Sequence, residues 1–202
     1  MTYYKATRPD GTSFYDRKTA WVVGETVTIK SRDRRKDLCG EGILHASDAP
    51  AETLVGGEWP CRLFEVEGKP VAQEGHKFGF HELTVVRELP AWQALGPNGE
   101  AVAALIERAG RMTEDEARRL GAAWYAAVAA TYTAWYAAWY AAYTAAYTAA
   151  YTAAYAAYVA ADARYTSVAS AAAFALAVRD LISEEDFQVL YGPWASVMEV
   201  EE

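Results

Sequence analysis

Hydrophobic and polar positions follow different patterns in the two halves of the chain. Between residues 1 and 90, short runs of aromatic and β-branched residues alternate with Gly, Pro, Asn and Asp. This pattern is typical of short antiparallel strands joined by turns. After residue 113, Ala, Tyr, Trp and Thr recur every four residues. Because alanine has the highest helix propensity, the second pattern predicts helix. We therefore expect an α+β protein in which the strands precede the helices.

Four segments of the first half are candidate strands or hairpins. TYYKATRPDGTSFYD, at 2–16, has a Pro-Asp-Gly turn between two aromatic-rich runs, which predicts a hairpin. The other three are WVVGETVTIK at 21–30, CRLFEVEGKPV at 61–71 and FGFHELTVVREL at 78–89. Between them, SDAPAETL at 47–54 predicts one helical turn. We interpret residues 1–90 as a small, mainly antiparallel α+β domain.

Capping residues indicate where the helices of the second half begin. TEDE, at 113–116, is a capping box. No glycine or proline follows between Gly121 and Gly192, so nothing in the sequence ends the helix that starts there. SEED, at 183–186, is a second capping box and predicts a last helix ending near Tyr191. The expected parts are the α+β domain over 1–90, a connecting helix over 91–112, one long helix over 113–182, and a short helix with a tail over 183–202.

The long helix carries a four-residue repeat, which is most regular in AAYTAAYTAAYTAAY at 141–155. Each residue of an α-helix advances about 100°, so four residues overshoot one turn by about 40°. A period-four stripe therefore winds around a regular helix. Three alternatives remain open at the level of the sequence. The helix underwinds toward π-type turns, it coils as a whole with a right-handed sense, or neighbours surround it on every side.

The repeat also indicates a surface for self-association. Residues 121–161 contain no charged side chain, and a helix that is apolar all round is normally buried on all sides. Because the N-terminal domain is too small to cover it, we expect other copies of the chain to do so, in a ring, bundle or filament. Tyrosine and tryptophan supply contact area and hydrogen-bonding groups. The expected interface residues are Trp124, Tyr132, Trp135, Tyr136, Trp139, Tyr140, Tyr143, Tyr147, Tyr151 and Tyr155.

The charge distribution bears on other partners and on location. The chain has 202 residues and a formal net charge of -8, and after residue 120 only Arg164 and Arg179 are basic. The basic cluster KSRDRRK at 30–36 is interrupted by Asp33, which favours a solvated loop. Nucleic-acid binding needs a basic face, so we expect none. Two cysteines make no disulfide framework and the N-terminus has no apolar signal segment, which predicts a cytoplasmic location.

An uncharged helix is also compatible with membrane insertion or ice binding. Its length exceeds the about 20 residues that span a bilayer. Tyrosine and threonine are spread along it instead of forming belts at its ends, and alanine is weakly apolar, which disfavours a membrane span. An ice-binding face needs threonine at intervals of three helical turns, and only Thr133 and Thr144 have that spacing. Membrane and ice interaction are therefore kept as alternatives to self-association.

CGEGILHASDAP, at 39–50, is the candidate for catalysis. Cys39 and His45 would form a nucleophile–base pair, or begin a metal site with Cys61 and either His76 or His81. The spacing is unspecific and no tight cysteine pair occurs, so we favour a buried cysteine and a backbone-bonded histidine, with no cofactor. His-Ala-Ser after an apolar pair also resembles the histidine-containing strand of ADP-ribosyltransferase-like folds, without a matching downstream Tyr or Glu. An enzyme acting through Cys39 and His45 is the alternative function.

Four stretches carry a wider resemblance: YKATRPDGTSFYD, CGEGILHAS, WPCRLFEVEG and LISEEDFQVLYGPWASV. They are similar to an uncharacterised family of actinobacterial and phage proteins in which a small domain precedes a variable repeat. The resemblance covers most of 1–120 and 175–198 and implies no activity. In similar proteins we expect repeat units such as Ala-Ala-Trp-Asp or Ala-Ala-Arg-Asp, whereas this chain has Tyr and Thr where charges would sit. This departure favours burial or self-assembly, and the prediction is a non-enzymatic structural protein that forms homo-oligomers.

Overall fold

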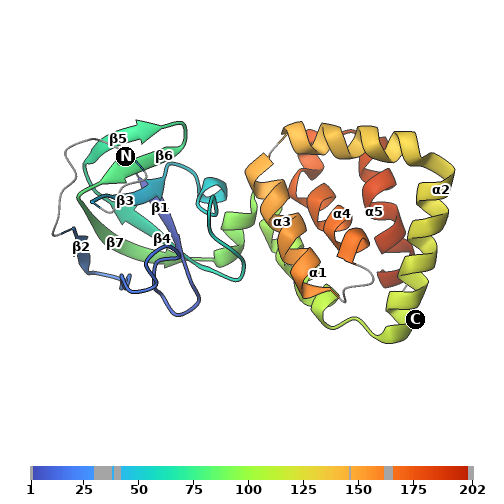
Figure 1. Cartoon of the computed structure of the whole chain (residues 1–202), viewed down its shortest axis with the longest axis horizontal. Coiled ribbons are helices and arrows are strands. Elements are labelled where there is room, and N and C mark those ends of the chain that lie inside the picture. Colours follow the sequence, from blue (N-terminus) through green and yellow to red (C-terminus); the bar gives the residue numbers. More distant parts are fainter. Residues whose placement is uncertain (1, 30–37, 39–41, 146, 162–165, 200–202) are drawn as a thin grey trace. The chain divides into compact units, whose positions relative to one another are not determined.

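The chain forms two compact units, Met1–Ala94 and Leu95–Glu202. The structure is a computed structural model that describes residues 2–29, 38, 42–145, 147–161 and 166–199, without the side chains of 128–132, 145 and 150. The first unit contains an antiparallel sheet and the second contains helices (Figure 1). The α+β class expected from the sequence is therefore confirmed.

Seven antiparallel strands form one sheet in the described part of the first unit. Their order is β2-β7-β4-β1-β3-β6-β5, so β1 lies at the centre while β2 and β5 are the edges. The strands are β1 (Tyr3–Thr7), β2 (Thr26–Thr28), β3 (Leu44–Ser47), β4 (Arg62–Glu67), β5 (Pro70–Glu74), β6 (Lys77–Phe80) and β7 (Glu82–Leu89). The helical turn expected within 47–54 is a single 3-10 turn, η1 (Pro50–Glu52).

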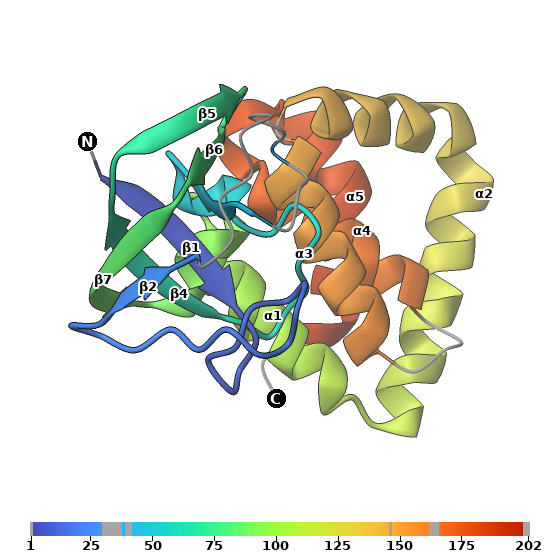
Figure 2. The ribbon, with the colours of Figure 1, turned by 60° about the vertical axis from the view of Figure 1, so that its left-hand side comes forward.

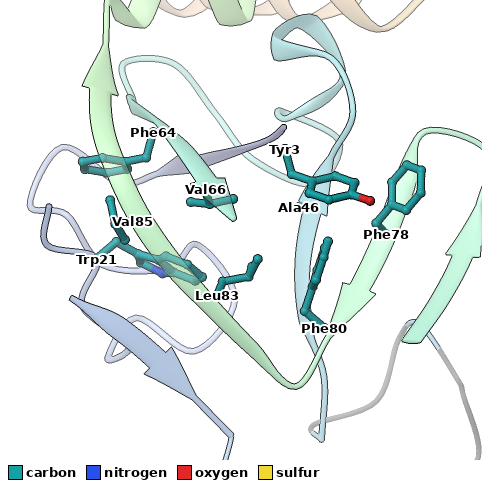
Figure 3. Close-up of a cluster of buried hydrophobic side chains, with 9 residues drawn as sticks. All are labelled: Tyr3, Trp21, Ala46, Phe64, Val66, Phe78, Phe80, Leu83 and Val85. Atoms are coloured by element: carbon teal, nitrogen blue, oxygen red, sulfur yellow. The ribbon is translucent and has the colours of Figure 1, made fainter. Parts of the chain in front are cut away.

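One face of this sheet carries a hydrophobic core (Figure 3). Residues two apart on a strand point to the same face, which brings together the apolar side chains of β4, β6 and β7. Tyr3 from the central strand packs edge-on against Phe80, with ring centroids 4.8 Å apart. Trp21 is buried, and its indole N–H donates to Ser13 Oγ at 2.8 Å. The cluster consists of Tyr3, Trp21, Ala46, Phe64, Val66, Phe78, Phe80, Leu83 and Val85.

For the hairpin predicted at 2–16, the turn is confirmed and the prediction of a second strand is wrong. Gly11 has φ +81°, a backbone conformation that favours glycine, and the Thr12 amide donates to Asp10 Oδ1 at 2.9 Å. After the turn only one bridge forms, between Thr12 and Ala20, and β1 pairs with β3 and β4 instead. Asp16 Oδ1 accepts hydrogen bonds from the backbone amides of Lys18 and Thr19, which bends the chain into another turn. This local turn explains why the second strand of the hairpin does not form.

The other strand predictions hold in position and differ in detail. Among the described residues 21–29, β2 is the one strand, and Gly24, with φ +86°, precedes it. The segment 78–89 lies mainly in two strands, β6 and β7. The turn at Gly68 joins β4 to β5 as expected. A Cβ on Gly68 would lie only 2.6 Å from the carbonyl oxygen of Glu82, so the close approach of β7 requires glycine there.

The second unit is helical. A 3-10 segment, η2 (Ala91–Leu95), precedes it. Its elements are α1 (Gly99–Gly110), α2 (Glu114–Ala145), α3 (Tyr147–Ala160), α4 (Thr166–Ala177), η3 (Arg179–Leu181) and α5 (Glu184–Met198). α4 packs against both α3 and α5, and α2 packs against α5. α2 bends midway and, together with α3, runs around α4 and α5 (Figures 1 and 2).

The single helix expected over 113–182 is instead three helices, α2, α3 and α4. The chain folds back so that alanine faces meet alanine faces. Ala153 and Ala157 of α3 are fully buried, as are Ala169 and Ala172 of the neighbouring α4. A helix gains most of its stability from tertiary packing, and folding back supplies that packing within one chain. The cover that we expected from other copies therefore comes partly from the chain itself.

The geometry of α2 and α3 shows how the helices accommodate a period of four. α3 has 14 residues and contains three successive tyrosines of the repeat, Tyr147, Tyr151 and Tyr155. Across the two steps between Tyr147 and Tyr155 the stripe drifts by about 80°. The described residues of α2 and α3 are α-helical throughout. Within these residues the chain does not underwind into π-type turns, so the stripe winds around each helix as the sequence predicts for a regular α-helix.

The capping box at 113–116 has both of its hydrogen bonds, and at 183–186 Ser183 caps the helix as the sequence predicts. The Glu116 amide donates to Thr113 Oγ1 at 3.3 Å, and the Thr113 amide donates to Glu116 Oε2 at 2.8 Å. At the last helix, the Asp186 amide donates to the Ser183 hydroxyl at 3.1 Å. Hydrogen bonds between residues three apart depend only on local sequence, which explains why these starting points were predictable.

The predicted end of the last helix, near Tyr191, is wrong. α5 continues through Pro193 to Met198. A proline inside a helix removes one hydrogen bond and costs about 3 kcal/mol. Here Trp194 and Val197 are buried beyond it. Burial of large apolar side chains yields about 1.5–3 kcal/mol each, enough to offset the proline.

Candidate functional site

A row of stacked aromatic rings runs along the end of α2 and along α3, and we call it the aromatic ladder. It comprises Trp139, Tyr143, Tyr147, Tyr151 and Tyr155. Successive ring centroids are 5.2, 4.8, 5.8 and 6.5 Å apart. Residues four apart are neighbours on a helix surface, so the repeat places each ring against the ring one turn away. The row continues from α2 to α3 through Tyr143 and Tyr147, which meet edge to face at an interplanar angle of 71°.

The three ladder tyrosines on α3 are exposed to solvent in a similar way. Tyr147 and Tyr151 are stacked with an interplanar angle of 28°, and Tyr151 and Tyr155 with an angle of 5°. Their centroids are 5.8 and 6.5 Å apart, so the rings are offset and do not cover one another completely. The three side chains are nearly equally exposed, at 52%, 55% and 52%. The ladder therefore presents a row of half-exposed tyrosine side chains on α3.

At its inner end the ladder is anchored in the helical unit. Trp139 stacks on Phe174 of α4, with centroids 5.4 Å apart and an interplanar angle of 7°. Trp124 and Trp135 pack edge to face at 5.4 Å. Phe174 is buried, and sequence reasoning missed it as a partner of the ladder. The only available signal was that it is the one aromatic residue within the alanine-rich stretch 166–177.

Six tyrosines at the outer side of α2 and α3 make up what we call the tyrosine face. They are Tyr136, Tyr140, Tyr147, Tyr151, Tyr155 and Tyr158, with exposed fractions between 52% and 60%. Tyr143 links the two helices, since it lies beside Tyr140 and its hydroxyl is hydrogen-bonded to that of Tyr147, which raises the pKa of Tyr143. No charged residue occurs in this part of the sequence. The face is thus uncharged, half-exposed and contiguous with the ladder.

The ten predicted interface residues fall into three groups. Five lie on the tyrosine face: Tyr136, Tyr140, Tyr147, Tyr151 and Tyr155. Four are half-buried: Trp124, Trp135, Trp139 and Tyr143. The side chain of Tyr132 lies outside the described part of the structure. Tyr158 is an addition, which the sequence pattern did not single out because the repeat is interrupted before it.

The predicted catalytic pair is only half described. Cys39 lies outside the described residues. His45 lies on β3, and its Nε2 is buried without a hydrogen-bond partner among the described residues. Burial, together with the positive charges of Lys77 and Lys5, lowers the pKa of His45 to about 4. A histidine with so low a pKa is a weak general base at neutral pH.

The alternative metal site is not assembled in the described part of the chain. Cys61 is a free, buried cysteine, and burial raises its pKa to about 12, so the thiol stays protonated at neutral pH. His76 Nδ1 is hydrogen-bonded to Asp48 Oδ1 at 2.8 Å, which raises the pKa of His76. Among the described residues, no three His, Cys, Asp or Glu side chains come together in a metal-binding arrangement.

Lys5 is a cation that lies against the core of the sheet unit. It lies on β1 opposite Phe64 of β4, and its Nζ is 5.2 Å from the centroid of the Trp21 ring. Burial lowers the pKa of Lys5 to about 8, although the charge of Asp16 acts in the opposite direction. The ammonium is therefore held against the hydrophobic core at a cost to stability, with a cation–π contact as partial compensation.

An open polar depression of about 530 Å³ is also present in the first unit, lined by Thr2, Glu67, Gly68, Glu82 and Thr84. Its two carboxylates would favour a cation. The basic cluster at 30–36 lies outside the described residues. No helix in the described ranges combines the length and hydropathy that a membrane span needs. Comparison of the chain with protein families, characterised proteins and solved structures gives no match, so its function is inferred from its own residues.

Proposed function

We propose that this chain is a structural protein that associates with copies of itself through the tyrosine face. The observation that carries the proposal is the exposure of six tyrosines, each by more than half, on two helices without a charged side chain between them. An uncharged aromatic surface of this size lies at the upper end of what monomeric proteins expose, and such surfaces often mark interaction sites. The proposal is narrower than the sequence suggested, because the alanine side of α3 already packs on α4.

The available area fits an interface. An aromatic side chain offers about 150–250 Å², so six tyrosines that are about half-exposed present about 600 Å². The largest apolar patch of a typical monomer is about 300–600 Å². A stable protein–protein interface buries about 800 Å² on each partner. The tyrosine face and the alanine and threonine side chains around it therefore approach the size that a specific complex needs.

A second copy is the partner that matches this face best. The chain has a net charge of -8, and the tyrosine face is where two acidic copies approach without bringing like charges together. Two identical repeats also have identical spacing, so rings and hydroxyls of one copy meet those of the other in step. A phenol both donates and accepts hydrogen bonds, which allows the same surface to pair with itself. We take the location to be cytoplasmic, which the free thiol of Cys61 supports.

The test places charges on the tyrosine face and leaves the buried residues of the helical unit unchanged. Tyr147→Lys, Tyr151→Lys and Tyr155→Lys together place three charges on exposed positions, and sedimentation velocity follows the mass from micromolar to submillimolar concentration. Tyr15→Lys is the control, because Tyr15 is 86% exposed and lies in the first unit. We expect the wild type and the control to associate and the triple variant to stay monomeric.

Two results would contradict the proposal. One is a wild-type chain that remains monomeric at every concentration, and the other is a triple variant that assembles like the wild type. The competing function, an enzyme acting through Cys39 and His45, is separated by the substitutions Cys39→Ala and His45→Ala. Both should leave the distribution of masses unchanged, because neither residue belongs to the tyrosine face.

A further inference from the structure

We infer that the tyrosines of α3 pair with those of a second copy in more than one register, so that assembly is open-ended instead of stopping at a closed dimer. This inference rests on the proposed function and specifies how the partner is seated. It concerns three rungs of the aromatic ladder, Tyr147, Tyr151 and Tyr155, which we call the α3 row.

The three rungs of the α3 row present nearly the same surface. Their exposed fractions are 52%, 55% and 52%, and their rings are stacked on one another. One unit of the repeat advances the helix by about 6 Å. The observed centroid spacings of 5.8 and 6.5 Å agree with that step. A second copy that slides by one unit therefore meets a surface almost identical to the one it left.

Nothing in the described α3 selects one position over the next. Helix pairs normally fix their register with a buried polar residue or with complementary charges beside the seam. α3 has the sequence YTAAYTAAYAAYVA and carries no charge. Its only polar side chains are Tyr and Thr, and all of them except Tyr158 belong to the repeat itself. The inner face is held against α4 by Ala153 and Ala157, so the outer row is rigid and its step is constant.

The winding of the row makes the pairing incomplete in every register. The row turns by about 80° between Tyr147 and Tyr155, whereas a partner helix lies along one side. Two α3 helices therefore cover only part of each row, wherever they are placed. The rungs that stay uncovered have the same chemistry as those that are paired, and they accept a further copy. Repeated contacts of this kind give staggered chains of increasing length.

The experiment installs a register that the wild type lacks. In an antiparallel pair centred on Tyr151, position 147 of one copy faces position 155 of the other. The double variant Tyr147→Lys/Tyr155→Glu places an ammonium opposite a carboxylate at both ends of that arrangement, and it leaves charges unmatched when the copies slide by one unit. Tyr147→Lys/Tyr155→Lys is the matched control, since it changes the same positions and brings like charges together in the same pair.

Sedimentation velocity and negative-stain microscopy over a range of concentrations read out the result. We expect the wild type to give a broad, concentration-dependent series of sizes, the Lys/Glu variant to stop at a dimer, and the Lys/Lys variant to remain monomeric. A wild-type chain with one limiting oligomeric mass overturns this inference and leaves the proposed function intact. A wild-type chain that never associates overturns both.

Folding of the variants does not limit the test. All three rungs are half-exposed, and circular dichroism of each variant checks whether the helix content is retained. If the Lys/Glu variant keeps the broad distribution of the wild type, the register of α3 does not control the size and the inference fails. The wild-type distribution alone is decisive even if one variant does not fold.

Discussion

Replacing Lys5 with methionine should stabilise the sheet unit, and the size of the effect follows from the lysine's surroundings. Nζ lies 5.2 Å from the centroid of the Trp21 ring, and burial lowers the pKa of Lys5 from 10.5 to about 8. One pKa unit corresponds to 1.36 kcal/mol, so the folded state carries the ammonium at a cost of about 3 kcal/mol near pH 7. Methionine keeps the length of the side chain and removes the charge, so we expect a gain approaching that value.

The sign of the pH dependence follows from the same shift. Between about pH 8 and pH 10.5 the unfolded chain keeps the proton of Lys5 and the folded chain does not. The unfolded state then binds more protons, and the free energy of unfolding rises with pH through that window. The advantage of Lys5→Met should therefore fall from about 3 kcal/mol near pH 7 to about 1.5 kcal/mol near pH 9.5.

Urea denaturation read by hydrogen exchange in peptides from β1 and β4 isolates the sheet unit from the helices. Comparing Lys5→Met with the wild type at each pH cancels titrations that both chains share. Lys69→Met is the control, because Lys69 is exposed, and it should change stability by no more than about 0.5 kcal/mol at either pH. A Lys5→Met chain that is less stable than the wild type near pH 7, or whose advantage does not fall as pH rises, would refute the reasoning.

Three further substitutions test the packing described above. Gly68→Ala should destabilise the sheet unit by about 2 kcal/mol in urea, because the new Cβ would lie 2.6 Å from the Glu82 carbonyl oxygen. Phe174→Ala should cost the helical unit about 3–5 kcal/mol in thermal unfolding, since it removes a buried ring that supports the ladder. In a Cys39→Ala background, Cys61 should resist a thiol reagent until the chain unfolds, because its pKa is about 12.

The controls for these substitutions are also provided by the chain. At Gly192, on α5, a new Cβ would come no closer than 3.9 Å to Gln188, so Gly192→Ala should be neutral or stabilising by about 1 kcal/mol. Equal losses for Gly68→Ala and Gly192→Ala would show that the approach of β7 is not limiting. Tyr125→Ala removes an exposed ring instead of a buried one and should cost far less than Phe174→Ala. Rapid labelling of Cys61 in the folded chain would contradict its burial.

Local hydrogen bonding accounts for what was predictable from the sequence. The starts of α2 and α5 depend on contacts between residues three apart, Thr113 with Glu116 and Ser183 with Asp186. The strand positions followed from alternation that is read over four to eight residues. The order of the strands was not predictable, since β1 at the centre pairs with β3 and β4 through contacts distant in sequence.

The division of the long helix depended on packing that no local pattern encodes. α2 ends at Ala145 and α3 begins at Tyr147, within a unit that reads the same as its neighbours. The position of α3 instead depends on its packing against α4, where alanine side chains of both helices are buried. Five of the predicted interface tyrosines do lie at the surface, because the period of four is visible in the sequence. Their anchor, Phe174, was invisible because stacking on Trp139 is a tertiary contact.

The alanine packing between α3 and α4 places a limit on how this repeat can change in length. Adding one unit extends the helix by about 6 Å and turns every later residue by about 40°. A single inserted unit would thus rotate part of the alanine side away from α4 and part of the tyrosine side toward it. Only after about nine units does the helix return to its starting orientation. Exchange of outward residues is therefore easy for this fold, whereas gain or loss of one unit shifts which side of the helix is buried.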